Sequence, residues 1–162
     1  MIVNDAMVLI HLTKMSIIEK SCEHWDVVIP ELIHKEVTHP AHPEGKIIDS
    51  LIAGKKLQVK TVKNKELIKK ANEFNIQRGE AEAVTLYWEA HADFIATDDD
   101  NVRKKSTILN LNIIGTPAIM LTLYRKKVID KEKMTNAIKV LKECGWFSST
   151  VFDKLHGEIK NG

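Results

Sequence analysis

Acidic residues follow two of the apolar runs that are expected to form buried strands. Asp5 comes directly after Ile2-Val3-Asn4. Asp98 and Asp99 come directly after the run at residues 94–97. In an open α/β sheet, ligands bind in the crevice beyond the carboxyl ends of the strands. An acid in this position is also a common helix N-cap. The pattern therefore predicts carboxylates from two separate segments at one edge of a sheet, either as caps or as ligands.

Two glutamates share helical faces with apolar side chains. Glu36 lies three residues after Ile33 and four after Leu32, so a carboxylate there is paired, binds a ligand, or lies at the rim of the core. Glu80 follows Gly79 in the first turn of a predicted helix, where the helix dipole favours an anion. Both glutamates are expected to point toward the body of the protein.

A group of four or five carboxylates needs protons or a cation. Two unit charges ~4 Å apart in an effective dielectric near 20 repel each other by about 4 kcal/mol. Sites built only from oxygen ligands favour hard cations, Mg²⁺ or Mn²⁺, over Zn²⁺. Such a cation in an open crevice suits phosphoester hydrolysis, because it activates water and stabilises charge on the phosphate.

The elements that must position these acids alternate between strands and helices. Apolar and alternating runs predict strands at residues 2–4, 26–29, 57–62, 94–97 and 113–114. Helical spacing predicts helices at 7–18, 31–37, 47–52, 66–74, 80–90 and 100–109, and helix throughout 117–159 with a break at Gly145. Continuous apolar strands between helices indicate a parallel sheet covered on both faces. The expected fold class is α/β, a three-layer α/β/α sandwich with a mostly parallel sheet of four to five strands and C-terminal helices.

The composition is that of one globular domain. The chain has 162 residues, of which 44% are hydrophobic and 28% charged, and this excludes disordered, coiled-coil and disulfide-scaffold classes. No apolar run approaches the ~20 residues that span a bilayer. The N-terminal residues lack the basic region of a signal peptide, and Cys22 and Cys144 are expected to be free thiols. We therefore expect a cytoplasmic protein with no membrane partner.

Ordered blocks of this sequence resemble the motifs of PIN-domain proteins. The run at residues 2–10, IVNDAMVLI, looks like the opening strand–Asp–helix signature of the family. The run at 28–37, VIPELIHKEV, resembles its iPxxxxEV segment, and GEAEAV at 79–84 is similar to the GEAEA-type helix start of an archaeal and bacterial branch. TDDDNVR at 97–103 and IGTP at 114–117 match its DDxxAR element and the GT turn that follows. The blocks occur in family order over roughly residues 1–125.

This resemblance implies a nuclease that depends on Mg²⁺ or Mn²⁺ and acts on RNA by two-metal-type in-line attack of water. It implies catalytic roles for Asp5, Glu36, Glu80 and Asp99, with the adjacent Asp98 as a further metal ligand or as an alternative to Asp99. It also implies an RNA substrate, an antitoxin protein as partner if the chain is the toxin of a toxin–antitoxin pair, and a homodimer. The expected organisation is a PIN-like nuclease domain at 1–125 and a C-terminal helical extension at 126–162 packed on the same domain.

Basic residues follow the acids by about one helical turn. Arg103 and Lys104 suit contacts with nucleic-acid phosphates, although Arg103 can also form an ion pair with Asp99. The Arg103 guanidinium is expected to face the solvent if it contacts phosphates, and to lie against Asp99 if it forms the ion pair.

Two other functions are compatible with these residues. The sequence departs from the family at Ala6-Met7, where relatives carry Thr, Ser or Asn beside the first Asp. This leaves open, as an alternative to the nuclease, a non-catalytic PIN module that binds RNA or a protein partner. An aspartate-based phosphotransferase, phosphorylated on Asp5 or Asp98, would leave Glu36 and Glu80 without a role.

Overall fold

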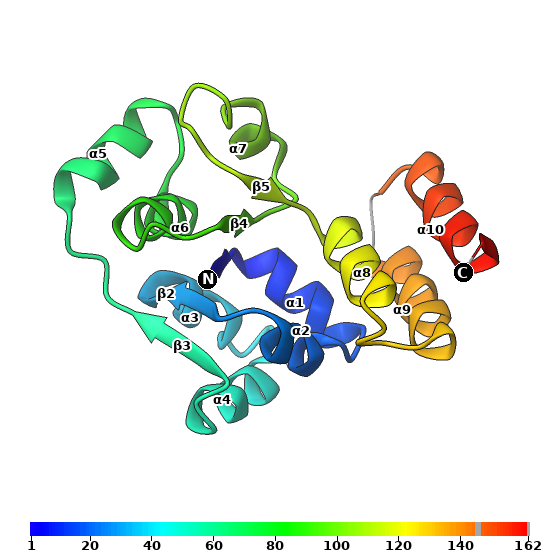
Figure 1. Cartoon of the computed structure of the whole chain (residues 1–162). Helices are drawn as coiled ribbons and strands as arrows, with labels where there is room; N and C mark the ends of the chain where they lie inside the picture. Colours follow the sequence, from blue (N-terminus) through cyan, green and yellow to red (C-terminus); the bar gives the residue numbers. More distant parts are fainter. Residues whose placement is uncertain (145–146, 162) are drawn as a thin grey trace.

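A five-stranded parallel sheet forms the centre of the protein (Figure 1). The structure is a computed structural model that describes residues 1–144 and 147–161. The strands lie in the order β3-β2-β1-β4-β5. Their bounds are β1 (Ile2–Asn4), β2 (Val27–Pro30), β3 (Leu57–Lys60), β4 (Phe94–Ala96) and β5 (Ile113–Ile114). All four pairings are parallel, which confirms the expected α/β class.

The register of the two inner strands brings the predicted acids together. Asn4 at the end of β1 pairs with Ala96 at the end of β4. The Asp5 backbone N–H donates to the carbonyl oxygen of Ala96, with an N···O distance of 2.9 Å. The residues that follow the two strands, Asp5 and Thr97-Asp98-Asp99, therefore leave the sheet at the same edge.

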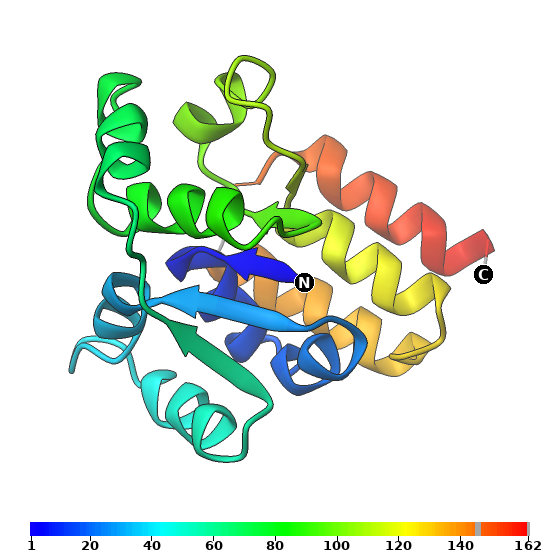
Figure 2. The ribbon, with the colours of Figure 1, turned by 60° about the vertical axis from the view of Figure 1, so that its left-hand side comes forward.

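Helices cover both faces of the sheet, as Figure 2 shows from a second side. Their bounds are α1 (Ala6–Lys14), α2 (Ile18–His24), α3 (Glu31–Val37), α4 (Gly45–Ala53), α5 (Lys65–Glu73), α6 (Arg78–Glu89), α7 (Asp100–Lys104), α8 (Thr116–Arg125), α9 (Lys131–Cys144) and α10 (Ser149–Asn161). Helix α6 packs on β1, β2 and β4, while α1 packs with α2, α8 and α9. The expected three-layer α/β/α arrangement is confirmed.

Three predicted helices end earlier than their apolar patterns suggest. The helix predicted at 7–18 is divided by Ser16, the one predicted at 100–109 stops at Lys104 and is followed by turns, and the C-terminal run is interrupted after Arg125. Ser16, Asn110 and Lys127 have left-handed backbone, with φ of 58°, 55° and 59°. Ser16 and Lys127 interrupt two of the predicted helices, and neither residue type is typical of this conformation, so the sequence gives no signal there. Asn110 lies beyond the C-cap of α7 at Lys105 and ends the turns that follow that helix. The break predicted at Gly145 lies outside the described residues.

The C-terminal helices pack on the rest of the chain. Helix α10 contacts α8 and α9, and α9 contacts α1. The Arg125 guanidinium at the end of α8 forms an ion pair with Glu158 in α10. Cys22 and Cys144 are free thiols, as predicted. Within the described part of the chain, no helix combines the length and apolar character needed to cross a membrane.

Candidate active site

Asp5 occupies the point where β1 passes into α1. Its carboxylate caps that helix by accepting a hydrogen bond from the backbone N–H of Val8, with an N···O distance of 2.9 Å. The hydroxyl of Thr97 is also hydrogen-bonded to this carboxylate. The residue is almost completely buried. The predicted capping role of Asp5 is therefore observed together with its place at the edge of the sheet.

Glu36 and the start of α6 are neighbours because Gly79 has no side chain. A Cβ atom at Gly79 would lie 2.9 Å from Cδ1 of Ile33 and 3.3 Å from Oε2 of Glu36. A larger residue would push α3 and α6 apart. The glycine thus allows the Glu36 carboxylate to approach the first turn of α6, which carries Glu80.

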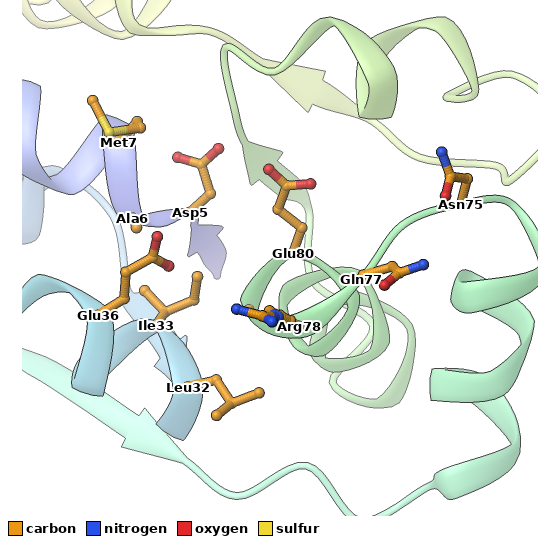
Figure 3. A pocket seen from close by; sticks show the side chains of 11 residues that line it. Asp5, Ala6, Met7, Leu32, Ile33, Glu36, Asn75, Gln77, Arg78 and Glu80 are labelled. Atoms are coloured by element: carbon orange, nitrogen blue, oxygen red, sulfur yellow. The ribbon is translucent and has the colours of Figure 1, made fainter.

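The carboxylates of Asp5, Glu36 and Glu80 face a common cavity (Figure 3). Its volume is about 760 Å³. Besides the three acids, the lining has an apolar side formed by Ala6, Met7, Leu32 and Ile33. The other side is formed by Asn75, Gln77, Arg78 and Gly79. Three acids from β1/α1, α3 and α6 thus meet in one cavity, although they are far apart in the sequence.

Asp99 joins this group through Glu80. The two side chains are hydrogen-bonded to each other, and both Asp99 and Glu36 repel the charge of Glu80. One Asp99 oxygen also caps α7 by accepting from the backbone N–H of Val102, at 2.9 Å. We call the four side chains Asp5, Glu36, Glu80 and Asp99 the acidic cluster.

Burial and mutual repulsion raise the pKa of two members of the acidic cluster. The pKa of Asp5 is raised to about 7, chiefly by burial and further by the charges of Asp98 and Glu80, against the opposing hydrogen bonds from Thr97 and Val8. The pKa of Glu80 is also raised to about 7, chiefly by burial and then by Asp99 and Glu36. Near neutral pH these carboxyls therefore retain protons that ordinary carboxyls have lost.

Asp98 has other partners. Its two oxygens accept hydrogen bonds from the backbone N–H and the hydroxyl of Thr116 at the start of α8, the first at 2.8 Å. Nδ1 of His11 lies 3.7 Å from the same carboxylate. Asp98 is buried and does not line the cavity. It ties the end of β4 to α8, and its role as a metal ligand stays a prediction.

Arg103 and Lys104 lie outside the cavity. Both are exposed residues of α7. The Arg103 guanidinium lies beside Gly115, because a Cβ there would be 3.0 Å from its Nη1 atom. In the part of the chain that the structure describes, Arg103 forms no ion pair with Asp99, so this alternative is not realised here. Their binding of nucleic acid stays a prediction.

The sequence did not identify several residues of the site. Thr97, directly after β4, places its hydroxyl beside Asp5. Met7 and Leu32 keep 42% and 38% of their surface exposed at the cavity. Arg78 adds a cation to its wall. Thr97 was visible only as the last residue of a predicted strand. Met7 was visible only as part of the departure from the family, Leu32 only as an apolar neighbour of Glu36, and Arg78 gave no signal.

The donor chemistry of the acidic cluster fits a hard divalent cation. All its ligand atoms are carboxylate oxygens, which Mg²⁺ and Mn²⁺ prefer. The raised pKa values of Asp5 and Glu80 show carboxyls that lack a neutralising charge. Among residues 1–144 and 147–161, no three His, Cys, Asp or Glu side chains are grouped tightly enough to hold an ion as they stand. The acidic cluster therefore fits a divalent cation in the type and charge of its donor atoms, and not in a preformed coordination geometry.

A comparison with protein families identifies the class of this protein. Residues 1–160 match the model of the DUF3368 family, described as a PIN domain. Because this match spans nearly the whole chain, the chain belongs to the PIN-domain family, a nuclease-type fold. Membership of the GEAEA-type branch stays a prediction. The search of curated proteins and the search of solved structures gave no match.

Proposed function

We propose that this protein is a metal-dependent phosphodiesterase, a ribonuclease that hydrolyses RNA with Mg²⁺ or Mn²⁺. The observation that carries the proposal is the meeting of Asp5, Glu36 and Glu80 in one cavity at the carboxyl edge of the sheet. Burial, and to a smaller extent the charges of neighbouring carboxylates, raise the pKa of Asp5 and of Glu80 to about 7. Perturbed carboxyls in a cavity are typical of functional sites, and the family is one of nuclease-type folds.

Each residue of the acidic cluster has a part in this proposal. Asp5 is fixed by its hydrogen bonds with Val8 and Thr97, so its carboxylate enters the site in a defined orientation. Glu36, Glu80 and Asp99 would hold the cation with it. When bound, Mg²⁺ or Mn²⁺ lowers the pKa of water and neutralises charge on a phosphate, which suits in-line hydrolysis of the two-metal type. Asp5 and Glu80 would release their protons as the cation binds.

An RNA cleavage assay tests the proposal. The purified protein should degrade single-stranded RNA with Mg²⁺ or Mn²⁺ and stop in EDTA. Asp5→Asn should lower the rate at least about 100-fold, because the ligand loses its charge while its amide oxygen can still cap α1. Asp153→Asn, an exposed change in α10, is the matched control and should cleave like wild type. Equal cleavage by metal-loaded and EDTA-treated protein would contradict the proposal.

A non-catalytic PIN module that binds RNA or a protein is the second candidate. The exposed apolar side chains of Met7 and Leu32 at the cavity favour it, because such side chains commonly contact ligands. The two functions differ in one result. A binding module retains RNA in a filter or anisotropy assay but does not cleave it with any divalent cation.

The biological partners are also proposals. We propose from the family resemblance that the chain is the toxin of a toxin–antitoxin pair, neutralised by an antitoxin protein, and that it forms a homodimer in the cytoplasm. A toxin should stop growth on expression, and co-expression of the adjacent small reading frame should restore it. Light scattering tests the dimer, for which the expected mass is twice 18.4 kDa.

A further inference from the structure

Arg78 is a cation beside the acidic cluster that neutralises none of its members. It begins α6 and lines the same cavity as Asp5, Glu36 and Glu80. No ion pair joins its guanidinium to a carboxylate in the stretches of chain that the structure describes. The Arg78 side chain is exposed, and a guanidinium offers several N–H donors and no acceptor. A charge-assisted hydrogen-bond donor is therefore available to an anion that enters the cavity.

The backbone of Arg78 is strained. Its φ of 52° lies in the left-handed region, which glycine adopts freely and arginine does not. Six other described non-glycine residues also have a positive φ, so this conformation does not by itself mark a functional site. Such residues persist where surrounding packing fixes them. The close contact of Gly79 with Ile33 and Glu36 supplies such packing one residue later.

The cavity is larger than one phosphate requires. Its volume of about 760 Å³ is that of a site for a ligand of nucleotide size or more. Figure 3 shows that it extends past the carboxylates to Arg78, on the side where Leu32 and Ile33 provide an apolar surface. The two ends thus differ in chemistry, with carboxylates at one and a guanidinium near an exposed leucine at the other.

We propose that Arg78 binds the phosphate next to the one that is cleaved, and that Leu32 contacts the nucleoside between the two phosphates. The inference rests on the proposed function and specifies its substrate as a strand with at least two consecutive phosphates. The planar guanidinium matches phosphate oxygens with two parallel hydrogen bonds, which lysine cannot form. Arg78 is then a residue that positions the strand, while the acidic cluster acts at the scissile phosphate.

The gain from a second phosphate tests this role. The kcat/KM values for cleavage of UpU and of UpUpU are measured in the presence of Mn²⁺ for wild type, Arg78→Gly and Arg78→Lys. For wild type, kcat/KM for UpUpU should be at least about tenfold higher than for UpU, which is the gain expected of a charge-assisted hydrogen bond. Arg78→Gly should lose most of this gain, and Arg78→Lys should keep only part of it. The same gain in Arg78→Gly as in wild type, or no gain in wild type, would overturn the inference.

Binding in Ca²⁺ provides a second readout that needs no cleavage. The probe is a fluorescent U8 RNA, and its affinity is measured at several salt concentrations. Arg78→Gly should reduce the slope of log K against log salt by about 0.7, the loss of one phosphate contact on a single strand. The matched control is Lys127→Gly, which also removes one cation from a left-handed position, with φ of 59°, in the turn just after α8.

Melting temperatures separate binding from structure. Both glycine variants should keep or raise the melting temperature, because glycine relieves the left-handed strain. A fall in melting temperature for Arg78→Gly with an unchanged salt slope would assign Arg78 a structural role and overturn the inference. If wild type binds U8 but cleaves neither UpU nor UpUpU with Mg²⁺ or Mn²⁺, the proposed function fails and the salt slope still decides the role of Arg78.

Discussion

Asp98 and Asp99 are adjacent in sequence and lie in opposite environments. Asp98 is buried and accepts two hydrogen bonds from Thr116, with His11 close by. Asp99 is half-buried and lies against the Glu80 carboxyl, whose pKa it raises. One carboxylate stabilises the junction of β4 and α8. The other adds repulsion to a cavity, which a folded protein tolerates where a ligand relieves it.

The same contrast occurs within α6. Glu80 faces the acidic cluster, whereas Glu82, two residues later, accepts a hydrogen bond from the backbone N–H of Leu32 at 3.0 Å and so caps α3. Glu89 at the end of the helix accepts from the backbone N–H groups of Lys63 and Asn64 and so holds the segment that leads into α5. In both comparisons, the partner of a carboxylate separates a structural acid from a functional one, whereas its presence in a motif does not.

The largest expected effect distinguishes the two glutamates of α6. Glu80→Gln should lower RNA cleavage at least about 100-fold, because it removes a charge from the proposed cation site. Glu82→Gln should keep cleavage within a few-fold and lower the free energy of unfolding by about 1 kcal/mol, since a neutral oxygen caps α3 less well than a carboxylate. RNA cleavage rates and urea unfolding are measured for both variants. Equal losses of activity in both variants would remove the distinction.

The pH dependence of stability extends the contrast to the whole acidic cluster. The pKa values of Asp5 and Glu80, about 7 in the folded protein, exceed their unfolded values near 4. Between these values the folded state binds more protons, so the free energy of unfolding without metal should fall as pH rises from about 4 to about 7. Each carboxyl contributes at most about 1.4 kcal/mol per pH unit, and the half-exposed Glu80 contributes less.

Urea unfolding in EDTA from pH 5 to pH 8 measures this slope. The Asp5→Asn variant serves as the control for other groups in the chain. The variant should show a shallower fall than wild type, because its side chain has no proton to lose. A wild-type stability that is constant or rises between pH 5 and pH 7, with the same slope in Asp5→Asn, would show that these carboxyls titrate normally.

Much of the fold followed from local patterns in the sequence. The short apolar runs ending at Asp5 and Asp98 predicted two strands, because burial on both faces requires continuous apolar residues. The orientation of Glu36 and of Glu80 toward the body of the protein also followed from the position of each on its own helix. These features depend on residues within one or two turns of each other.

Other features of the site depend on contacts across the fold. The hydrogen bonds from Thr116 to Asp98 and from Thr97 to Asp5 join segments that only the sheet brings together. The left-handed backbone of Arg78 is not typical of arginine, so no propensity indicates it. A sequence pattern could therefore place the acids at one edge but could not tell Asp98 from Asp99.

Amide substitutions at the two aspartates should change stability in opposite directions. Asp98→Asn should lower the free energy of unfolding by about 2 kcal/mol, because one of the two Thr116 donors loses its charged acceptor in a buried place. Asp99→Asn should raise it by ~1 kcal/mol at pH 8 without metal, since it removes repulsion toward Glu80 and Asn still caps α7. Asp99→Asn should also abolish most of the rise in melting temperature that Mg²⁺ produces. Destabilisation by both variants, with the Mg²⁺ effect intact, would make both acids structural.

The smallest expected effects concern Arg103 and Lys104, which lie on α7 outside the cavity. If they contact phosphates, Arg103→Ala and Lys104→Ala should each weaken binding of U8 RNA a few-fold, independent of base sequence, and reduce the salt slope by about 0.7. Lys126→Ala, an exposed change just after α8, is the control and should leave the slope unchanged. Arg103 has a competing structural position beside Gly115. An unchanged slope with a lower melting temperature in Arg103→Ala would assign it to that position, because a contact that stabilises only the fold releases no counterions when RNA binds.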